Sequence, residues 1–305
     1  MAIDLTKLRY FVAVAEEEHI TRAAERLDMQ QPPLSRQIRL MERELKVQLF
    51  RRLPRGVELT SAGHALLPEA RAMLARFDRA LEIARRAARG EQGSLCVGIA
   101  PTAPFNPMVP KAIHAFREAF PMVSLVLEEG LSNEVVTRFD SDQMDVAFVR
   151  APQVRAQGVV VTPLQEEPMI VALPSNHPIA KRGKAQLISL TALANDPFIL
   201  IGPQGTGLHD ETVAACRAAG FMPKLGQPAP RITSTLSLVS AGLGIALIPS
   251  TMQSVRIAGI VYRRLRAPVP KAFLGLAFRR SDPSPVLKQF LSVVRAIARS
   301  SPAIQ

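Results

Sequence analysis

The feature that most constrains the fold is an unbroken helical pattern over residues 60–89, TSAGHALLPEARAMLARFDRALEIARRAAR. Apolar residues recur in it at spacings of three and four: Leu67, Ala70, Leu74, Phe77, Leu81, Ala84 and Ala88. A helix of this length spans roughly 40 Å, and Thr60 or Ser61 can cap its start. Because the stripe is narrow and rich in alanine, it favours packing against a partner helix. The segment RGEQGS at 89–94 ends the pattern, so we expect a linker helix of 61–89 between a domain of 1–60 and a domain of 90–305.

Three shorter helices are expected before the linker. Residues 5–18 carry apolar side chains at helical spacing, and a second helix is expected over about 21–27, with the small Ala23 and Ala24 at a close helix approach. A third begins near Pro32, because proline is favoured in the first turn of a helix, where its missing N–H would have no partner. The second and third helices, joined by a tight turn, form a helix-turn-helix pattern. The following QLFRRLPRGVELT predicts a small hairpin, or wing.

The third helix and the wing are strongly basic, and three interpretations compete: a solvated basic helix, a phosphate-binding enzyme loop, and a helix that enters a DNA groove. The net charge of +12 favours an anionic partner. Side chains that reach base edges or phosphates are Gln31, Ser35, Arg36 and Arg39 on the helix, and Arg51, Arg52 and Arg55 on the wing. Because a three-helix core, a proline start and a basic hairpin coincide, double-stranded DNA is the favoured partner.

From Leu95 onward, short apolar strands alternate with helices. The expected strands are LCVGIA, VSLVLEEG, DVAFVR, PMIVALP, PFILIG, GIALIP and FLGLAFR. This alternation predicts α/β architecture with mostly parallel sheets. The length of the region favours two α/β subdomains, the first over about 94–160 and 268–300 and the second over about 161–267.

The N-terminal stretch resembles the winged helix-turn-helix of the LysR-type transcriptional regulators. The matching elements are AAERL at 23–27, QPPLSRQI at 31–38, MEREL at 41–45 and LTSAG at 59–63, where Met41 replaces the usual leucine. The resemblance implies that Gln31, Pro32, Ser35 and Arg36 contact the major groove and that Arg55 contacts the minor groove. It also implies a homodimer or homotetramer, and an effector domain like the periplasmic binding proteins. RNA polymerase is a further candidate partner.

A candidate effector site lies at the strand ends of the α/β region, where open sheets bind ligands. Thr102 and Ser132 follow two expected strands and Arg150 ends a third, so together they could hold a small carboxylate. The full set of candidate effector contacts is Pro101, Thr102, Ser132, Arg150, Thr206, Gly207 and Leu208. By resemblance, these positions match effector contacts in the subgroup that senses aromatic acids or their ring-cleavage products. The alternatives are helix capping for the hydroxyls, a hinge or a surface salt bridge for Arg150, and a plain connecting turn for the loop around Gly205.

Several other classes of protein are not favoured. The loop at 202–207 lacks the G-K-[ST] ending and the full G-x-G-x-x-G spacing of nucleotide-binding loops. The five histidines are scattered, and Cys96 and Cys216 are too few for a thiolate zinc site, so neither catalysis nor a metal or other cofactor is expected. No signal peptide is recognisable, and no apolar stretch approaches the about 18 residues of a membrane span, which indicates a cytoplasmic protein.

The sequence therefore predicts a sequence-specific DNA-binding transcriptional regulator whose promoter binding responds to a small aromatic or dicarboxylic acid. A ligand-independent DNA-binding repressor is the principal alternative. A solute-binding protein for uptake would not need the basic N-terminal domain. A metabolic enzyme with a fused DNA-binding head would need a reactive constellation that the sequence lacks.

Overall fold

The computed structural model describes residues 3–54, 56–141, 143–150, 156–181 and 187–301. The chain divides into two compact units, 1–86 and 87–305. The predicted three-part division, with a separate linker, stays a prediction.

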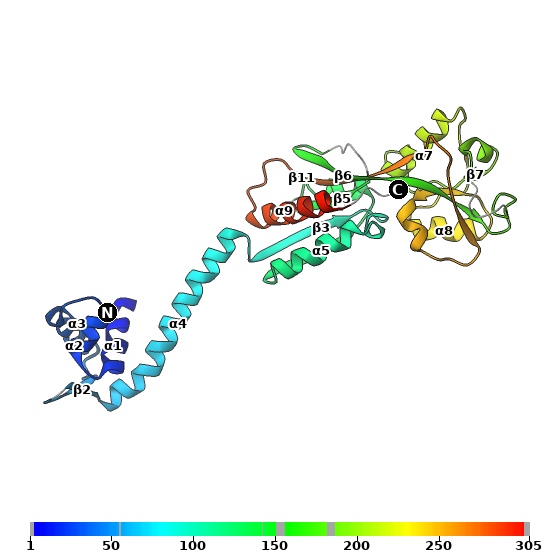
Figure 1. Cartoon of the computed structure of the whole chain (residues 1–305). Helices are drawn as coiled ribbons and strands as arrows, with labels where there is room; N and C mark the ends of the chain where they lie inside the picture. The colour runs from blue at the N-terminus through cyan, green and yellow to red at the C-terminus, as the bar shows by residue number, and fades with distance from the viewer. Residues whose placement is uncertain (1–2, 55, 142, 151–155, 182–186, 302–305) are drawn as a thin grey trace. The chain divides into compact units, whose positions relative to one another are not determined.

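The N-terminal unit holds the expected three helices and hairpin (Figure 1): α1 Leu5–Glu17, α2 Ile20–Arg26, α3 Gln31–Leu45, β1 Phe50–Leu53 and β2 Gly56–Leu59. Phe11 and Leu34 are fully buried at the centre of the three helices. The ring centroids of Phe11 and Phe50 lie 5.4 Å apart. Ala23 is also fully buried, as expected for a close helix approach. The strands pair antiparallel, with Leu53 opposite Gly56 at the turn, so the predicted wing is confirmed.

The long helix α4 runs over Ser61–Arg89, and the Thr60 hydroxyl caps it by accepting a hydrogen bond from the Gly63 N–H at 3.1 Å. Its first turns pack on the core of the N-terminal unit through Ala70 and Leu74. Further along, Phe77 and Leu81 are exposed. The predicted apolar stripe therefore serves two purposes: its first half completes the unit's own core, and its second half has an open face.

The C-terminal unit is built on one mixed sheet in the order β10-β6-β11-β5-β3-β4, with β9 also paired to β6. Its strands are β3 Gly93–Ile99, β4 Val123–Glu129, β5 Val146–Val149, β6 Val159–Pro174, β9 Ala246–Pro249, β10 Ile260–Arg264 and β11 Lys271–Arg279. A separate parallel pair joins β7 Pro197–Phe198 to β8 Lys224–Leu225. The helices are α5 Met108–Ala119, α6 Ser132–Thr137, α7 Gly207–Ala218, α8 Ile232–Ser240 and α9 Pro285–Ser300, with short turns η1 Ala103–Phe105, η2 Leu190–Leu193 and η3 Ser250–Ser254.

The prediction of mostly parallel sheets is wrong. Only β3 with β4, β3 with β5 and β7 with β8 are parallel among the described strands, and every pairing made by β6 and β11 is antiparallel. The alternation of strands and helices in the sequence does not show the direction of each strand. Strand β6 leads from the first hydrophobic core to the second and β11 leads back beside it, so the two are antiparallel.

Apart from a smaller cluster of residues from α6, β5 and β11, two hydrophobic cores lie along this sheet, one for each predicted subdomain. One gathers residues of β3, β5, α5 and α9, with Phe116 and Phe290 at its centre. The other gathers residues of β6, β9, α7 and α8, with Phe198 and Leu236 buried in it. Strands β6 and β11 continue from the first core to the second (Figure 1), so both subdomains share one ribbon of two strands.

Candidate functional site

The outer face of α3 carries most of the residues predicted to contact DNA. Pro32, Arg36 and Arg39 are exposed, and Gln31 is half-buried at the start of the helix. Pro32, Pro33 and Arg36 line a shallow surface groove along this face. Among the described residues, no acidic side chain lies within ion-pair distance of Arg36. This guanidinium is therefore available to an external acceptor.

Ser35 differs from its neighbours because it is buried, with 3% of its surface exposed. Its Oγ accepts hydrogen bonds from Nη2 of Arg39 at 3.3 Å and from Nη2 of Arg52 at 3.4 Å. The predicted outward direction of Ser35 is thus wrong, since the next turn of α3 and the wing cover it. The hydroxyl instead brings together one arginine of the helix and one of the wing.

The wing is tied to α3 by a residue that the sequence interpretation missed. The Glu42 carboxylate accepts hydrogen bonds from the backbone N–H groups of Leu49 at 2.9 Å and Phe50 at 3.1 Å. On the wing itself, Arg51 pairs with Glu58 at 2.5 Å across the hairpin. This pairing raises the pKa of Arg51 and lowers the pKa of Glu58, although both side chains are exposed. Arg55 lies outside the described residues.

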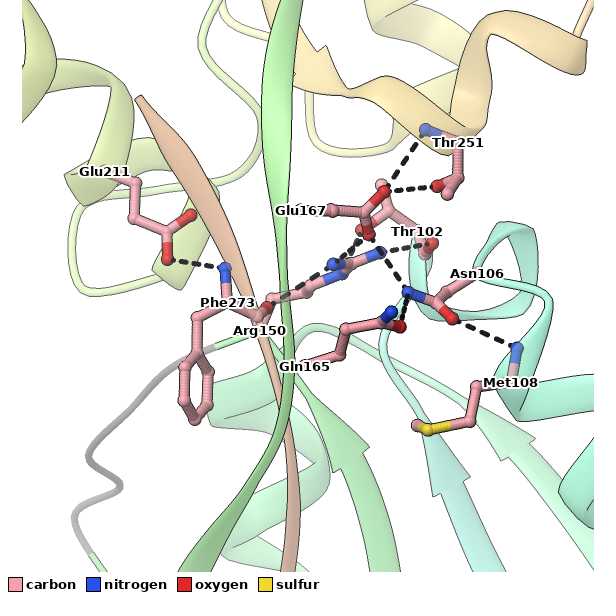
Figure 2. Close-up of polar contacts among 9 residues, drawn as sticks. All are labelled: Thr102, Asn106, Met108, Arg150, Gln165, Glu167, Glu211, Thr251 and Phe273. Atoms are coloured by element: carbon pink, nitrogen blue, oxygen red, sulfur yellow. Dashed lines mark hydrogen bonds and ion pairs between the residues drawn. The ribbon is translucent and has the colours of Figure 1, made fainter. Parts of the chain in front are cut away.

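In the C-terminal unit, the three residues predicted at strand ends lie together. The Arg150 guanidinium donates from Nε to Thr102 Oγ1 at 3.1 Å and from Nη2 to the Thr102 carbonyl at 3.0 Å (Figure 2). The Arg150 backbone N–H donates to Ser132 Oγ at 3.0 Å. All three residues are at most 5% exposed. The three residues therefore form one hydrogen-bonded cluster at the carboxyl ends of β3, β4 and β5.

The cluster contains an acidic residue that the prediction omitted. Arg150 Nη1 donates to Glu167 Oε1 at 2.7 Å, and both side chains are almost completely buried. The other oxygen of Glu167 accepts from the Thr251 N–H at 3.2 Å and the Thr251 hydroxyl at 2.6 Å, and Asn106 Nδ2 donates to Glu167 Oε1 at 3.4 Å (Figure 2). The positive charge of Arg150 is therefore already neutralised inside the chain. Glu167 lies on β6 and Thr251 on η3, so this network joins the two subdomains.

The two hydroxyl groups beside Arg150 each have a proton that donates no hydrogen bond to a described residue. Thr102 Oγ1 and Ser132 Oγ both accept a hydrogen bond from Arg150, and within the described part of the chain neither donates one. A hydroxyl has one proton to donate, and a buried donor without an acceptor is costly. Thr102 and Ser132 therefore present two buried donors to whatever acceptor reaches them.

The loop that precedes α7 approaches Ser132. A Cβ atom added to Gly202 would lie 3.4 Å from Cδ1 of Leu131, the residue before Ser132. The backbone N–H of Thr206, a predicted donor to the effector, already donates to the Pro203 carbonyl at 3.3 Å, and the Thr206 hydroxyl donates to the same carbonyl at 2.6 Å. The N–H groups of Gly207 and Leu208, in the first turn of α7, have no acceptor among the described residues, as is normal at a helix start. Pro101 is buried beside Thr102.

One turn further along α7, Glu211 connects this helix to β11. Its Oε1 accepts a hydrogen bond from the Phe273 N–H at 3.1 Å, and the Phe273 carbonyl accepts one from Arg150 Nη1 at 3.4 Å (Figure 2). Its Oε2 is buried without a partner in the described structure. Burial raises the pKa of Glu211 to about 7. The backbone of a single residue, Phe273, thus links the buried carboxyl to the guanidinium of Arg150.

Two features bear on other classes of site. Within the described ranges, histidine, cysteine, aspartate and glutamate form no group suited to a metal ion. None of the described helices has the length and apolarity needed to cross a bilayer.

Known proteins resemble the chain over nearly its whole length. Residues 5–64 match the family model described as a bacterial regulatory helix-turn-helix protein of the lysR family, and residues 88–299 match the LysR substrate binding domain. The HTH-type transcriptional regulator BudR of Raoultella terrigena is 36% identical, over 95% of this chain and 100% of that protein. The Hca operon transcriptional activator HcaR of Escherichia coli (strain K12) is 33% identical, over 96% of this chain and 97% of that protein. The crystal structure of full-length CbnR complexed with its target DNA superposes with a TM-score of 0.83 at 29% identity, covering 97% of this chain and all of CbnR.

Proposed function

The chain belongs to the LysR family of DNA-binding transcriptional regulators, and on that premise we propose that a small-molecule effector bound in its C-terminal unit controls how it binds promoter DNA. The family consists of regulators and not of enzymes. Acting on the chromosome, the protein would work in the cytoplasm.

The proposed DNA-binding surface is the exposed face of α3 together with the wing. Arg36 suits a guanine edge, because its guanidinium can donate two parallel hydrogen bonds and has no described carboxylate partner. The similarity over nearly the whole chain to CbnR, whose structure contains its target DNA, supports DNA binding by this unit but does not assign single residues. Arg51 is a weaker candidate than the sequence suggested, because Glu58 already neutralises its charge.

We further propose that α4 pairs with α4 of a second copy. Phe77 and Leu81 continue the predicted stripe but are exposed within the N-terminal unit, and exposed large apolar side chains at helical spacing favour a helix partner. A dimer of this kind presents two N-terminal units, the DNA-binding heads, to a partly palindromic site. Assembly into a tetramer and contact with RNA polymerase stay predictions.

The effector site that we propose is bounded by Thr102, Ser132 and the first turn of α7. The observation that carries it is the pair of buried hydroxyls, each of which accepts a hydrogen bond from Arg150 and donates none to any residue that the structure describes. A small carboxylic acid supplies the acceptors that these donors lack, and the N–H groups of Gly207 and Leu208 can add to them. Arg150 then orients the hydroxyls, because a carboxylate that reached its guanidinium would have to displace Glu167.

One observation favours the alternative, a DNA-binding repressor that needs no effector. Arg150 and Glu167 satisfy each other completely within the chain, with Thr251 and Asn106 completing the network. In a repressor of this kind, the network would hold the two subdomains together and would have no part in ligand binding. The two functions differ in one measurable respect, which is whether a ligand alters the contacts with DNA.

Thermal-shift screening of the full chain against aromatic and dicarboxylic acids is the first experiment, because a ligand that binds only the folded state raises its melting temperature. Calorimetry of a hit should then show that Thr102→Ala and Ser132→Ala each weaken binding about ten- to a hundredfold, the usual effect of losing a hydrogen bond to a charged group. Ser237→Ala, an exposed serine on α8, is the matched control. A DNA footprint that no stabilising acid alters would favour the ligand-independent repressor.

A further inference from the structure

The contact of Arg39 and Arg52 with Ser35 brings two guanidinium groups from different elements to one point. Arg39 comes from α3 and Arg52 from β1, yet both donate to the same oxygen atom. Two nitrogens that share an acceptor at these distances lie within about 7 Å of each other, where like charges repel appreciably. The wing and the helix are thus joined by a contact that is electrostatically unfavourable until an anion arrives.

No carboxylate of the described residues relieves this repulsion. Neither Arg39 nor Arg52 forms an ion pair there, whereas the neighbouring Arg51 pairs with Glu58 and Arg26 with Glu16. The acceptor that they share is a neutral, buried hydroxyl, which positions the two groups but leaves their charges in place. Both side chains are exposed apart from this contact, so their remaining donors face solvent. Guanidinium groups with free donors are the preferred partners of phosphate oxygens.

We propose that Arg39 and Arg52 together hold a single DNA phosphate, and that Ser35 is the positioning residue that keeps the two guanidinium groups together. This proposal rests on the proposed DNA-binding surface and goes beyond it by giving Ser35 no part in reading bases. One phosphate held from both α3 and the wing fixes the angle at which the helix enters the groove. Contacts to phosphates of this kind set register and orientation without carrying sequence information.

A shared phosphate has a distinctive dependence on salt. The slope of log K against log salt changes by about 0.9 for each phosphate that the protein neutralises. If one phosphate serves both arginines, the remaining arginine still neutralises it after a single substitution. Only the loss of both guanidinium groups lowers the number of phosphates that the protein neutralises. Two separate phosphates would instead be lost one at a time.

The test uses the full-length chain, a random duplex of about 30 base pairs, and fluorescence anisotropy between 50 and 200 mM NaCl, the range over which phosphate contacts dominate. The variants are Arg39→Ala, Arg52→Ala and the double substitution, with Arg79→Ala, an exposed arginine of α4, as the charge control. Each slope is divided by the number of bound heads, measured by the stoichiometry of the titration.

We expect both single variants to bind a few-fold more weakly at the wild-type slope, and the double variant to flatten the slope by about 0.9 per head. Arg79→Ala should match the wild type. A flattening of about 0.9 in each single variant and about 1.8 in the double variant would overturn the shared phosphate. Unchanged binding in all three would show that the pair does not touch DNA, while the DNA-binding function would stand. Failure of the wild-type chain to bind any duplex would reject both.

Ser35→Ala separates positioning from base reading. A positioning role predicts weaker binding to random and cognate duplexes alike, with partial recovery in Ser35→Thr, which keeps the hydroxyl. A loss confined to the cognate duplex would identify Ser35 as a base contact and overturn its assigned role. Circular dichroism tests whether each variant is folded. If the variants of the buried Ser35 do not fold, the variants of the exposed arginines decide the proposal.

Discussion

Ionisation of Glu211 should make the C-terminal unit less stable as the pH rises from about 5 to 8. Burial raises the pKa of this carboxyl to about 7, from an ordinary value of 4.5. Between these values the folded chain keeps a proton that the unfolded chain has released, so the free energy of unfolding falls as pH increases. Below pH 4.5 both states are protonated and the effect vanishes. One pKa unit corresponds to about 1.4 kcal/mol, so the loss at pH 8 reaches about 3 kcal/mol at most.

Glu211→Gln tests this prediction, because glutamine keeps the acceptor for the Phe273 N–H but cannot ionise. The chain has two tyrosines and no tryptophan, with Tyr10 in the N-terminal unit and Tyr262 on β10. In a Tyr10→Phe background, tyrosine fluorescence therefore reports only the C-terminal unit. Urea titrations at pH 5 and pH 8 give the free energy of unfolding by linear extrapolation.

The variant should lose up to about 3 kcal/mol of the wild type's pH dependence, and at pH 8 it should be the more stable protein. Glu129→Gln, which removes an exposed carboxylate at the end of β4 that does not contribute to the pKa of Glu211, should keep the wild-type pH dependence. An identical pH dependence in Glu211→Gln and the wild type would refute the reasoning, because the unpartnered buried oxygen would then carry no ionisation penalty.

Three further predictions follow from other contacts. Arg36→Ala should cost about 1–3 kcal/mol of affinity at a cognate promoter but little on random DNA, which gel-shift titrations measure; equal losses on both would mean a phosphate contact. Leu81→Glu should lower the oligomer mass in light scattering without unfolding the head, since Leu81 is exposed there; an unchanged mass would exclude this face from assembly. Arg150→Met and Glu167→Gln should each destabilise the C-terminal unit by about 3–5 kcal/mol in urea, and the double variant by less than the two losses together; strict additivity would mean that the pair is not coupled.

The helical elements could be predicted because their signals are local. Residues 61–89 repeat apolar side chains at helical spacing, and the structure places α4 over the same residues. The strand β6 was recognised only over 168–174, although it begins at Val159. Its first half, VVVTPLQEE, has no strand alternation, and its conformation is set by pairing with β11, a hundred residues later in the chain. The short strand β10 was missed for the same reason.

The candidate effector site was predictable only in part. Thr102, Ser132 and Arg150 could be placed together because carboxyl ends of neighbouring strands meet at one edge of a sheet. The partner of Arg150 could not, because Glu167 comes from the crossing strand β6 and no local pattern links the two. The predicted direction of Ser35 was wrong for a different reason. Helical periodicity assigned it to an outward face, but the wing, a separate element, covers that position.

The ribbon formed by β6 and β11 has a mechanical consequence. Two hydrogen-bonded strands cannot slide past each other without breaking their ladder, since a slip of one residue would turn every side chain to the opposite face. The ribbon can still bend, and its ladder is locally interrupted by the shift in register between Leu274 and Gly275. We therefore expect any movement of one subdomain against the other to bend or twist the ribbon and not to slide its strands. Insertions or deletions inside either strand should be far less tolerated than changes in the loops that the strands carry.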